Sequence, residues 1–216
     1  MFERETAFIL ANTEKASPPA VPEITLRLAT EITPLWQATE VFLEQNNVPP
    51  PYWAFPWVGG QALTRHLLEN PEIAKGKRVL DFAAGSGMSA IAAAKTGAVS
   101  AEAAEIDDMA CASILLNAAD NGVEVSLSQG IVLQRPDCPW DVVVAGDVCY
   151  EKPMAEAVFA WLRRCAKGGA EVYMADPGRA YLPRTGLMKV GSYSIPCSLE
   201  LEDRTSRDAV VYRIVG

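Results

Sequence analysis

Residues 78–97 read RVLDFAAGSGMSAIAAAKTG, and this stretch decides the fold class. A short apolar run comes first, a turn with two glycines follows, and an alanine-rich run of helical character completes the stretch. Gly85 and Gly87 lie in the turn, where the missing side chains let a ligand reach backbone N–H groups. The order of strand, glycine loop and helix therefore predicts a small-molecule site at the carboxyl end of a buried strand.

The same alternation of strand and helix continues toward the C-terminus. Strand-like runs follow at 99–105, 123–128, 141–146 and 170–175, with helix-like runs at 108–122 and 153–169. A short helix-like piece at 181–190 precedes two last strands, 194–202 and 208–215, and the five residues between these strands force an antiparallel pair. Alternating strands and helices favour a parallel sheet with right-handed crossovers. We therefore predict an α/β fold with a Rossmann-like, seven-stranded sheet that is mostly parallel and ends in an antiparallel hairpin.

The N-terminal third of the chain lacks this regular alternation. Residues 1–22 contain the stretch ANTEKASPPAVP and predict a flexible lead-in. Residues 23–77 predict an N-terminal extension with a strand at 24–30, helices at 35–47 and 59–71, and an aromatic, proline-rich flap at 48–60. We expect residues 23–216 to form a single domain, of which 78–216 are the seven-stranded core.

Composition and charge exclude several classes of protein. The chain has 216 residues, of which 50% are hydrophobic, and a formal net charge of −8. This apolar content suits one folded core, and no run of 18 uncharged apolar residues is present that would predict a membrane span. The acidic balance disfavours a nucleic-acid partner and is compatible with a cationic substrate. Because the start, MFERETAFIL, carries Glu3 and Glu5 beside Arg4 and so lacks the basic start of a signal peptide, we expect a cytoplasmic protein.

Cysteine and histidine usage argues against a metal site. The five cysteines form no C-x-x-C pair, and His66 is the one histidine of the chain. Neither a zinc site nor a disulfide framework follows from this pattern, and a Ser-His-Asp or Cys-His enzyme is disfavoured as well. We expect no metal.

Two acidic residues near the glycine loop narrow the range of ligands that could bind there. Asp81 ends its strand four residues before Gly85, where a pyrophosphate would meet a like charge, whereas a ligand with an ammonium group and no phosphate would be attracted. S-adenosylmethionine is such a ligand. Glu105 ends the next strand and can accept hydrogen bonds from both ribose hydroxyls, with Ile106 against the adenine. The alternative is that Asp81 and Glu105 only cap loops.

Further candidate contacts to this ligand lie beside those acids. Ser86 completes the loop between Gly85 and Gly87, and the third core strand is followed by a turn at the position of the adenine edge. The turn residues are Gln129, Gly130 and Ile131. Asp107 and Asp108 are expected to cap the helix that follows Glu105.

Four segments, in this order, resemble the seven-strand S-adenosylmethionine-dependent methyltransferases, and among them the electron transfer flavoprotein beta-subunit lysine methyltransferases. They are PPYWAFPWVGGQALTRHLLENPE (50–72), GKRVLDFAAGSGMSAIAAAKTGA (76–98), WDVVVAGDVCYE (140–151) and ADPGR (175–179). The resemblance implies a lysine acceptor, with the electron transfer flavoprotein beta subunit as the protein substrate. It also implies that Trp57 and the neighbouring Gly59-Gly60-Gln61, with Gly60 the main candidate, border the cofactor.

The same resemblance implies two catalytic residues. That family carries [DE]-x-x-[YF] after the fourth strand, which is Asp147-Val148-Cys149-Tyr150 in this chain. Asp147 would attract and orient the lysine ammonium, and Tyr150 would add a ring face or a hydroxyl contact. The alternatives are that Asp147 caps the helix starting near Pro153 and that Tyr150 is a core aromatic residue.

An acceptor pocket is expected around the catalytic pair. Asp176 and Arg179 follow the fifth strand on the same edge and could shape the pocket or bind an acidic part of the substrate, although Arg179 could equally pair with Asp147. Trp53 is the aromatic candidate for this pocket. The alternative for Trp53, as for Trp57, is ordinary packing of the flap on the sheet.

Three other functions remain open at this point. A methyltransferase for a ribosomal protein or a small amine would share the glycine loop. An NAD-dependent oxidoreductase is disfavoured by Asp81 and by the final antiparallel hairpin. A non-catalytic interaction module would not need the pair Asp147 and Tyr150.

Overall fold

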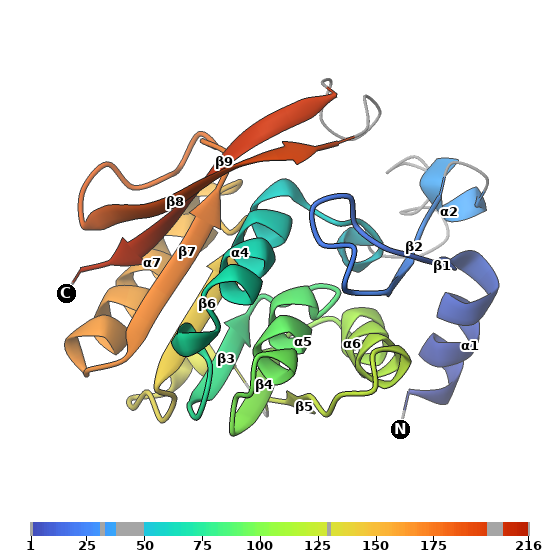
Figure 1. The fold of residues 1–216 in the computed structure, drawn as a ribbon, viewed down its shortest axis with the longest axis horizontal. Coiled ribbons are helices and arrows are strands. Elements are labelled where there is room, and N and C mark those ends of the chain that lie inside the picture. Colours follow the sequence, from blue (N-terminus) through green and yellow to red (C-terminus); the bar gives the residue numbers. More distant parts are fainter. Residues whose placement is uncertain (1, 31–32, 38–49, 129–130, 198–204, 216) are drawn as a thin grey trace.

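A computed structural model describes residues 2–30, 33–37, 50–128, 131–197 and 205–215. A seven-stranded sheet forms its centre (Figure 1), with the strand order β5-β4-β3-β6-β7-β9-β8. The strands are β3 (Arg78–Phe82), β4 (Ser100–Ala104), β5 (Ser126–Leu127), β6 (Val142–Gly146), β7 (Glu171–Asp176), β8 (Leu187–Pro196) and β9 (Ser206–Ile214). The strands from β5 to β7 pair in parallel, whereas β9 runs antiparallel to both β7 and β8. The predicted mostly parallel sheet with a C-terminal antiparallel hairpin is confirmed.

Helices cover both faces of this sheet (Figure 1). One face packs against α4 (Val58–Glu69), α5 (Met88–Lys95) and α6 (Asp108–Asp120), and the other against α7 (Lys152–Lys167). Alternate residues of β3 and β6 point to each face, so Val79 joins the first hydrophobic cluster and Leu80 the second. Within the described residues, no helix is both long enough and apolar enough to cross a membrane.

The N-terminal residues differ from the prediction. Instead of a flexible lead-in over residues 1–22, the chain forms α1 (Glu3–Asn12), which packs on α6, and β1 (Glu14–Ala16), which pairs with β2 (Leu26–Leu28). Ile9 and Val21 are fully buried, and this burial stabilises a segment whose polar composition had suggested disorder. The predicted strand at 24–30 is confirmed as the shorter β2.

The remaining elements of the N-terminal extension are short. Of the helix predicted at 35–47, the described part is α2 (Pro34–Gln37), and residues 38–47 lie outside the described residues. From residue 50 on, the proline-rich flap contains a 3-10 turn at Tyr52–Ala54, and α4 follows as predicted. Two more 3-10 turns lie at Pro71–Ile73 and Val132–Gln134.

The hairpin at the C-terminus is longer than predicted. β8 begins at Leu187, where Leu187 pairs with Ile214, so the helix-like piece expected at 181–190 is wrong. β8 is an edge strand, and most of its side chains are exposed or half-buried. Such a strand lacks the alternation of apolar and polar residues by which strands are found in sequences, which explains the error.

Candidate active site

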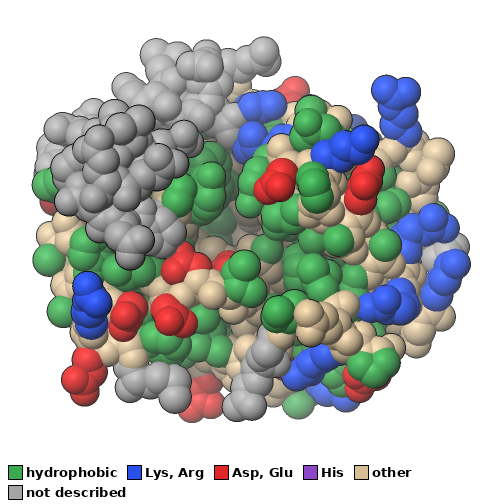
Figure 2. All heavy atoms as spheres, turned by 180° about the vertical axis from the view of Figure 1, so that it is seen from behind, with side chains coloured by type: hydrophobic (Ala, Val, Ile, Leu, Met, Phe, Trp, Pro, Cys, Tyr) green, Lys and Arg blue, Asp and Glu red, His purple; other side chains and the backbone are tan. Residues whose placement is uncertain are grey.

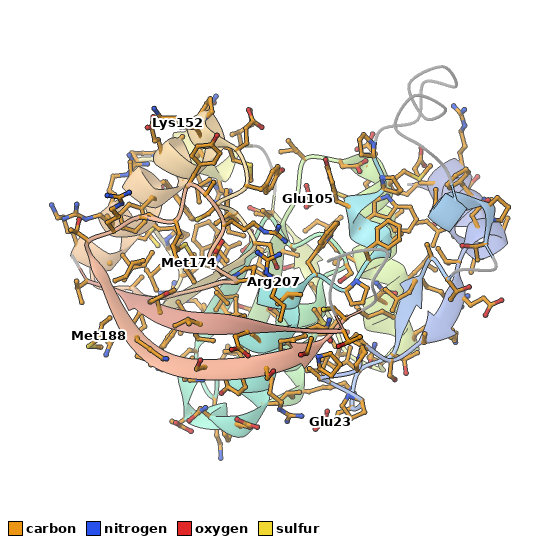
Figure 3. All side chains as sticks on the ribbon, turned by 90° about the horizontal axis from the view of Figure 1, so that it is seen from above. Glu23, Glu105, Lys152, Met174, Met188 and Arg207 are labelled. Atoms are coloured by element: carbon orange, nitrogen blue, oxygen red, sulfur yellow. The ribbon has the colours of Figure 1, made fainter. Side chains whose placement is uncertain are left out.

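The candidate residues gather at one edge of the sheet, where the parallel strands β3, β4, β6 and β7 end. Figure 2 shows a hollow near the top of the rear face, bordered by hydrophobic and acidic side chains. In the view from above, Glu105 lies at the centre of this edge, between the half built around α7 and the half built around α6 (Figure 3). The carboxyl ends of parallel strands are the usual ligand-binding edge of such sheets.

The glycine loop has a backbone that requires its glycines. Gly85 has a φ of 53° and Gly87 a φ of 75°, in the left-handed region that residues with side chains rarely adopt. A Cβ on Gly87 would also lie 3.0 Å from Ile114, whereas the space at Gly85 is open to 4.0 Å. Ser86, 6% exposed, is fixed by its carbonyl, which accepts a hydrogen bond from Asn117 (2.9 Å).

Asp81 lies beneath this loop rather than on its surface. Its carboxyl is 3% exposed, and Oδ2 accepts a hydrogen bond from the backbone N–H of Ala90, in the first turn of α5 (3.0 Å). Burial raises the pKa of Asp81 to about 8, and the Ala90 N–H opposes part of that rise. This contact matches the capping alternative, and a role for Asp81 toward a ligand stays a prediction.

Glu105 joins the ends of β3 and β4. Its Oε2 accepts a hydrogen bond from the backbone N–H of Gly85 (3.0 Å), and Oε1 accepts one from that of Ile106 (2.7 Å). Ile106 itself is 86% exposed, so its side chain is available to a planar ligand. Asp107 caps α6 by accepting a hydrogen bond from the backbone N–H of Met109 (2.9 Å), as predicted.

The turn expected at the adenine edge is described only in part. Gln129 and Gly130 lie outside the described residues. Ile131 is 53% exposed and directly precedes the 3-10 turn at Val132–Gln134. The contact assigned to these three residues stays a prediction.

Asp147 is held tightly at the end of β6. It has a φ of 55°, which asparagine and aspartate tolerate better than most residues, and its side chain is 12% exposed. Oδ2 accepts a hydrogen bond from the backbone N–H of Gly60 (2.7 Å), so Asp147 caps α4 and not, as the alternative stated, the helix near Pro153. Burial raises the pKa of Asp147 to about 6, and the Arg179 guanidinium opposes part of that rise.

Glycines let α4 approach β6 and β7 this closely. A Cβ on Gly59 would lie 2.7 Å from both the carbonyl oxygen of Ala175 and Asp147 Oδ2. A Cβ on Gly146 would lie 2.9 Å from the Cα of Gly60. Sequence reasoning missed the part played by Gly59 and Gly146, although the dipeptide Gly59-Gly60 at a helix start was a visible signal.

Three aromatic rings, those of Tyr150, Tyr52 and Trp57, lie next to one another just after β6 and before α4. Tyr150 is 48% exposed, so the alternative that it is a core aromatic residue is wrong. Its ring centroid lies 6.1 Å from that of Tyr52, a residue absent from the predicted site, and Tyr52 lies 6.0 Å from Trp57. Trp53 is only 3% exposed and packs with Ile9, which fits the packing alternative rather than a place in the acceptor pocket.

Asp176 and Arg179 lie beside Asp147 as predicted. Asp176 Oδ1 accepts hydrogen bonds from the backbone N–H groups of Gly178 (2.7 Å) and Arg179 (2.6 Å). Its Oδ2 is buried and accepts no hydrogen bond of regular geometry from the described residues. The Cys149 thiol lies close to this carboxyl group. Arg179 Nη2 donates to Asp147 Oδ1 (3.3 Å), so the predicted ion pair is present.

Comparisons with known proteins agree with this arrangement. The family model of the ribosomal protein L11 methyltransferases matches residues 61–149. The electron transfer flavoprotein beta subunit lysine methyltransferase of Xenopus laevis is 36% identical over 95% of this chain and 85% of its own length. The enzyme of the same name from Danio rerio is 35% identical over 95% of this chain and 81% of its own. The chain belongs to the electron transfer flavoprotein beta subunit lysine methyltransferase family.

A solved structure supports the fold of this family member. The magnesium protoporphyrin IX methyltransferase of Synechocystis PCC 6803, solved with bound S-adenosylmethionine, superposes with a TM-score of 0.52 and 14% identity, over 70% of this chain and 76% of that one. The predicted class I methyltransferase fold, enzyme class and cofactor are confirmed, and the NAD-dependent oxidoreductase alternative is removed.

The residues of this methyltransferase fit S-adenosylmethionine. A carboxylate offers about four acceptor positions, so Glu105 can still accept from ribose hydroxyls while it holds the glycine loop. Gly85 leaves open space, and Ile106 is exposed beside it. Among the described residues, no cluster of histidine, cysteine and acidic side chains could hold a metal ion.

Proposed function

We propose that this enzyme transfers methyl groups from S-adenosylmethionine to lysine side chains of the electron transfer flavoprotein beta subunit. The observation that carries the proposal is the Asp147 carboxylate, which is largely buried and aimed by the Gly60 N–H, three residues before the exposed Tyr150. Relatives that carry this activity in their names align with 95% of the chain. Location in the cytoplasm and the absence of a nucleic-acid partner stay predictions.

The cofactor half of the site consists of the glycine loop and the residues after β4. Glu105 would accept hydrogen bonds from the ribose hydroxyls, Ile106 would cover the adenine, and Gly85 to Gly87 would pass close to the methionine part. Trp57 and Gly60, which lie at the start of α4, would border this half. When bound, S-adenosylmethionine supplies a methyl group on a positively charged sulfur.

The acceptor half consists of Asp147, Tyr150 and Arg179. Free lysine titrates near ~10.4, so at neutral pH it arrives as a cation that the Asp147 carboxylate attracts. Tyr150 offers a half-exposed ring face to the ammonium and its methylenes. Only the neutral amine can attack, so the bound ammonium would first release a proton to solvent. The rate would then come mainly from alignment of the amine with the methyl group, because an in-line displacement needs no covalent intermediate on the enzyme.

Labelled S-adenosylmethionine provides the test of this proposal. The purified enzyme is incubated with the electron transfer flavoprotein beta subunit and, separately, with ribosomal protein L11, and the modified residues are located by mass spectrometry. We expect methyl-lysine in the flavoprotein subunit and none with Asp147→Ala. Methylation of the ribosomal protein alone would instead establish the second candidate function, which the family match over residues 61–149 favours.

A further inference from the structure

Three charged side chains meet where β6 and β7 end. The side chains of Asp147 and Arg179 are 12% and 20% exposed, and Asp176 is 1% exposed. With both carboxyl groups ionised, the trio carries a net negative charge, because it contains a single guanidinium. An excess negative charge in a largely buried site attracts a cation, so this site can accept one more.

Arg179 is positioned by three separate parts of the chain. Its backbone N–H donates to Asp176 Oδ1 (2.6 Å), and its Nη2 donates to Asp147 Oδ1 (3.3 Å). Its guanidinium carbon also lies 6.0 Å from the ring centroid of Trp57, at the outer limit of a cation–π contact. The guanidinium therefore lies between the Asp147 carboxylate at the end of β6 and the Trp57 ring of the aromatic flap, and it contacts both.

We propose that Arg179 is the positioning residue of the acceptor site, which keeps the Asp147 carboxylate ionised and aimed while the lysine ammonium binds beside it as the second cation. This inference rests on the proposed function for the identity of the acceptor. Arg179 acts through Asp147 and does not need to touch the methyl group.

The groups that face Asp147 support this role. Burial alone raises its pKa, and Asp176 at the end of β7 raises it further, whereas Arg179 and the Gly60 N–H at the start of α4 lower it. Arg179 is the one cation among these groups. Without it, Asp147 would take up a proton near neutral pH and would lose the charge that attracts an ammonium.

A direct titration tests this electrostatic role without any protein substrate. The carboxyl carbon of Asp147 is followed by carbon-13 NMR across pH 5 to 9 and assigned by its absence in Asp147→Asn. In Arg179→Gln we expect the Asp147 pKa to rise by about one or more, because an opposite charge at this distance typically lowers a carboxyl pKa by that amount. Arg179→Lys, which keeps the charge, should restore most of the shift.

The matched control is Arg184→Gln, which removes the same charge from the same loop at an exposed position. It should leave the Asp147 pKa unchanged. Arg179→Met provides a second neutral variant in case Arg179→Gln folds poorly. An Asp147 pKa that is unchanged in the neutral Arg179 variants overturns the inference.

The pH dependence of methylation provides the second readout. If the pKa rises from about 6 to about 7, the ionised share of Asp147 at pH 6.5 falls from roughly three quarters to roughly one quarter. With the flavoprotein beta subunit as acceptor, kcat/KM of Arg179→Gln should therefore be at least about threefold lower than wild type at pH 6.5 and nearly equal at pH 8.5. The affinity for S-adenosylmethionine, measured by calorimetry, should not change.

The possible outcomes separate the inference from the proposed function. An equal loss of kcat/KM at both pH values indicates a structural role and refutes the inference. A gain in activity also refutes it, because Arg179 would then compete with lysine for Asp147. If the wild-type enzyme does not methylate the flavoprotein subunit, the proposed function fails, and the NMR titration still decides the role of Arg179.

Discussion

Asp147→Asn should lower activity without lowering stability, because burial makes the charged form of the wild-type carboxylate unfavourable in the folded protein. Asparagine tolerates the φ of 55° and keeps an oxygen that can accept the hydrogen bond from Gly60, so the local structure should persist. The negative charge that attracts lysine is removed. Methyl transfer should fall by at least about tenfold, which corresponds to ~1.4 kcal/mol of lost transition-state stabilisation.

The stability of the same variant should change in the opposite direction. In the folded state the pKa of Asp147 rises from 3.8 to about 6, so the folded protein binds a proton more tightly than the unfolded chain does. Stability therefore falls as pH rises from about 4 to about 6 and then stays level, with a loss of up to about 3 kcal/mol from this one group. Asparagine removes this loss but also removes the ion pair with Arg179, so we expect a net gain of about 1 kcal/mol at pH 7.5.

Both effects can be measured on one preparation. Urea unfolding at pH 7.5 and pH 4.5 gives the two free energies of unfolding, and the advantage of Asp147→Asn should disappear at pH 4.5, where the wild-type carboxyl is neutral. At pH 7.5 the gain corresponds to a melting temperature higher by about 2 to 4 °C for a chain of this size. Wild-type methylation rates, or a less stable variant at pH 7.5, would refute this reasoning.

Three further substitutions test other parts of the site. Glu105→Ala should weaken S-adenosylmethionine binding by roughly tenfold to a hundredfold in calorimetry, because the hydrogen bonds to the ribose are lost. An unchanged affinity would show that Glu105 only holds the glycine loop. Gly59→Ala should lower the free energy of unfolding by about 1 to 3 kcal/mol in urea titrations, because its Cβ would lie 2.7 Å from Asp147 Oδ2; wild-type stability would show that α4 can move aside. Tyr150→Phe should reduce kcat less than Asp147→Asn does, since the ring is retained, and a larger loss would assign the chemistry to the hydroxyl.

Local patterns were sufficient to predict the glycine loop and its acids. The run RVLDF alternates between two buried faces and has Asp81 as its next-to-last residue, and the same periodicity puts Glu105 directly after β4. Parallel strands bring their carboxyl ends together, so these residues had to share an edge. Capping by Asp107 followed from its place before α6, because a capping side chain acts within its own turn.

The predictions failed where structure depends on contacts that are distant in sequence. The hydrogen bond between Asp147 and Gly60 joins residues 87 positions apart, and no local pattern indicates it. The helix α1 is stabilised by packing on α6 and not by its own composition. The error on β8 has a different cause, since its register shifts between Lys189 and Gly191 and this irregularity interrupts the periodic signal of the strand.

The division of the site between separate strands has a consequence for how such enzymes diverge. The segment shared with the ribosomal protein L11 methyltransferase family, residues 61–149, contains the glycine loop, Glu105 and Asp147, but ends before Tyr150 and Arg179. The loop after β7, which carries Arg179, lies beyond this segment, so the acceptor can change through this loop while the strands stay the same. New target proteins then require mutations in a few surface loops, without any redesign of the sheet that carries them.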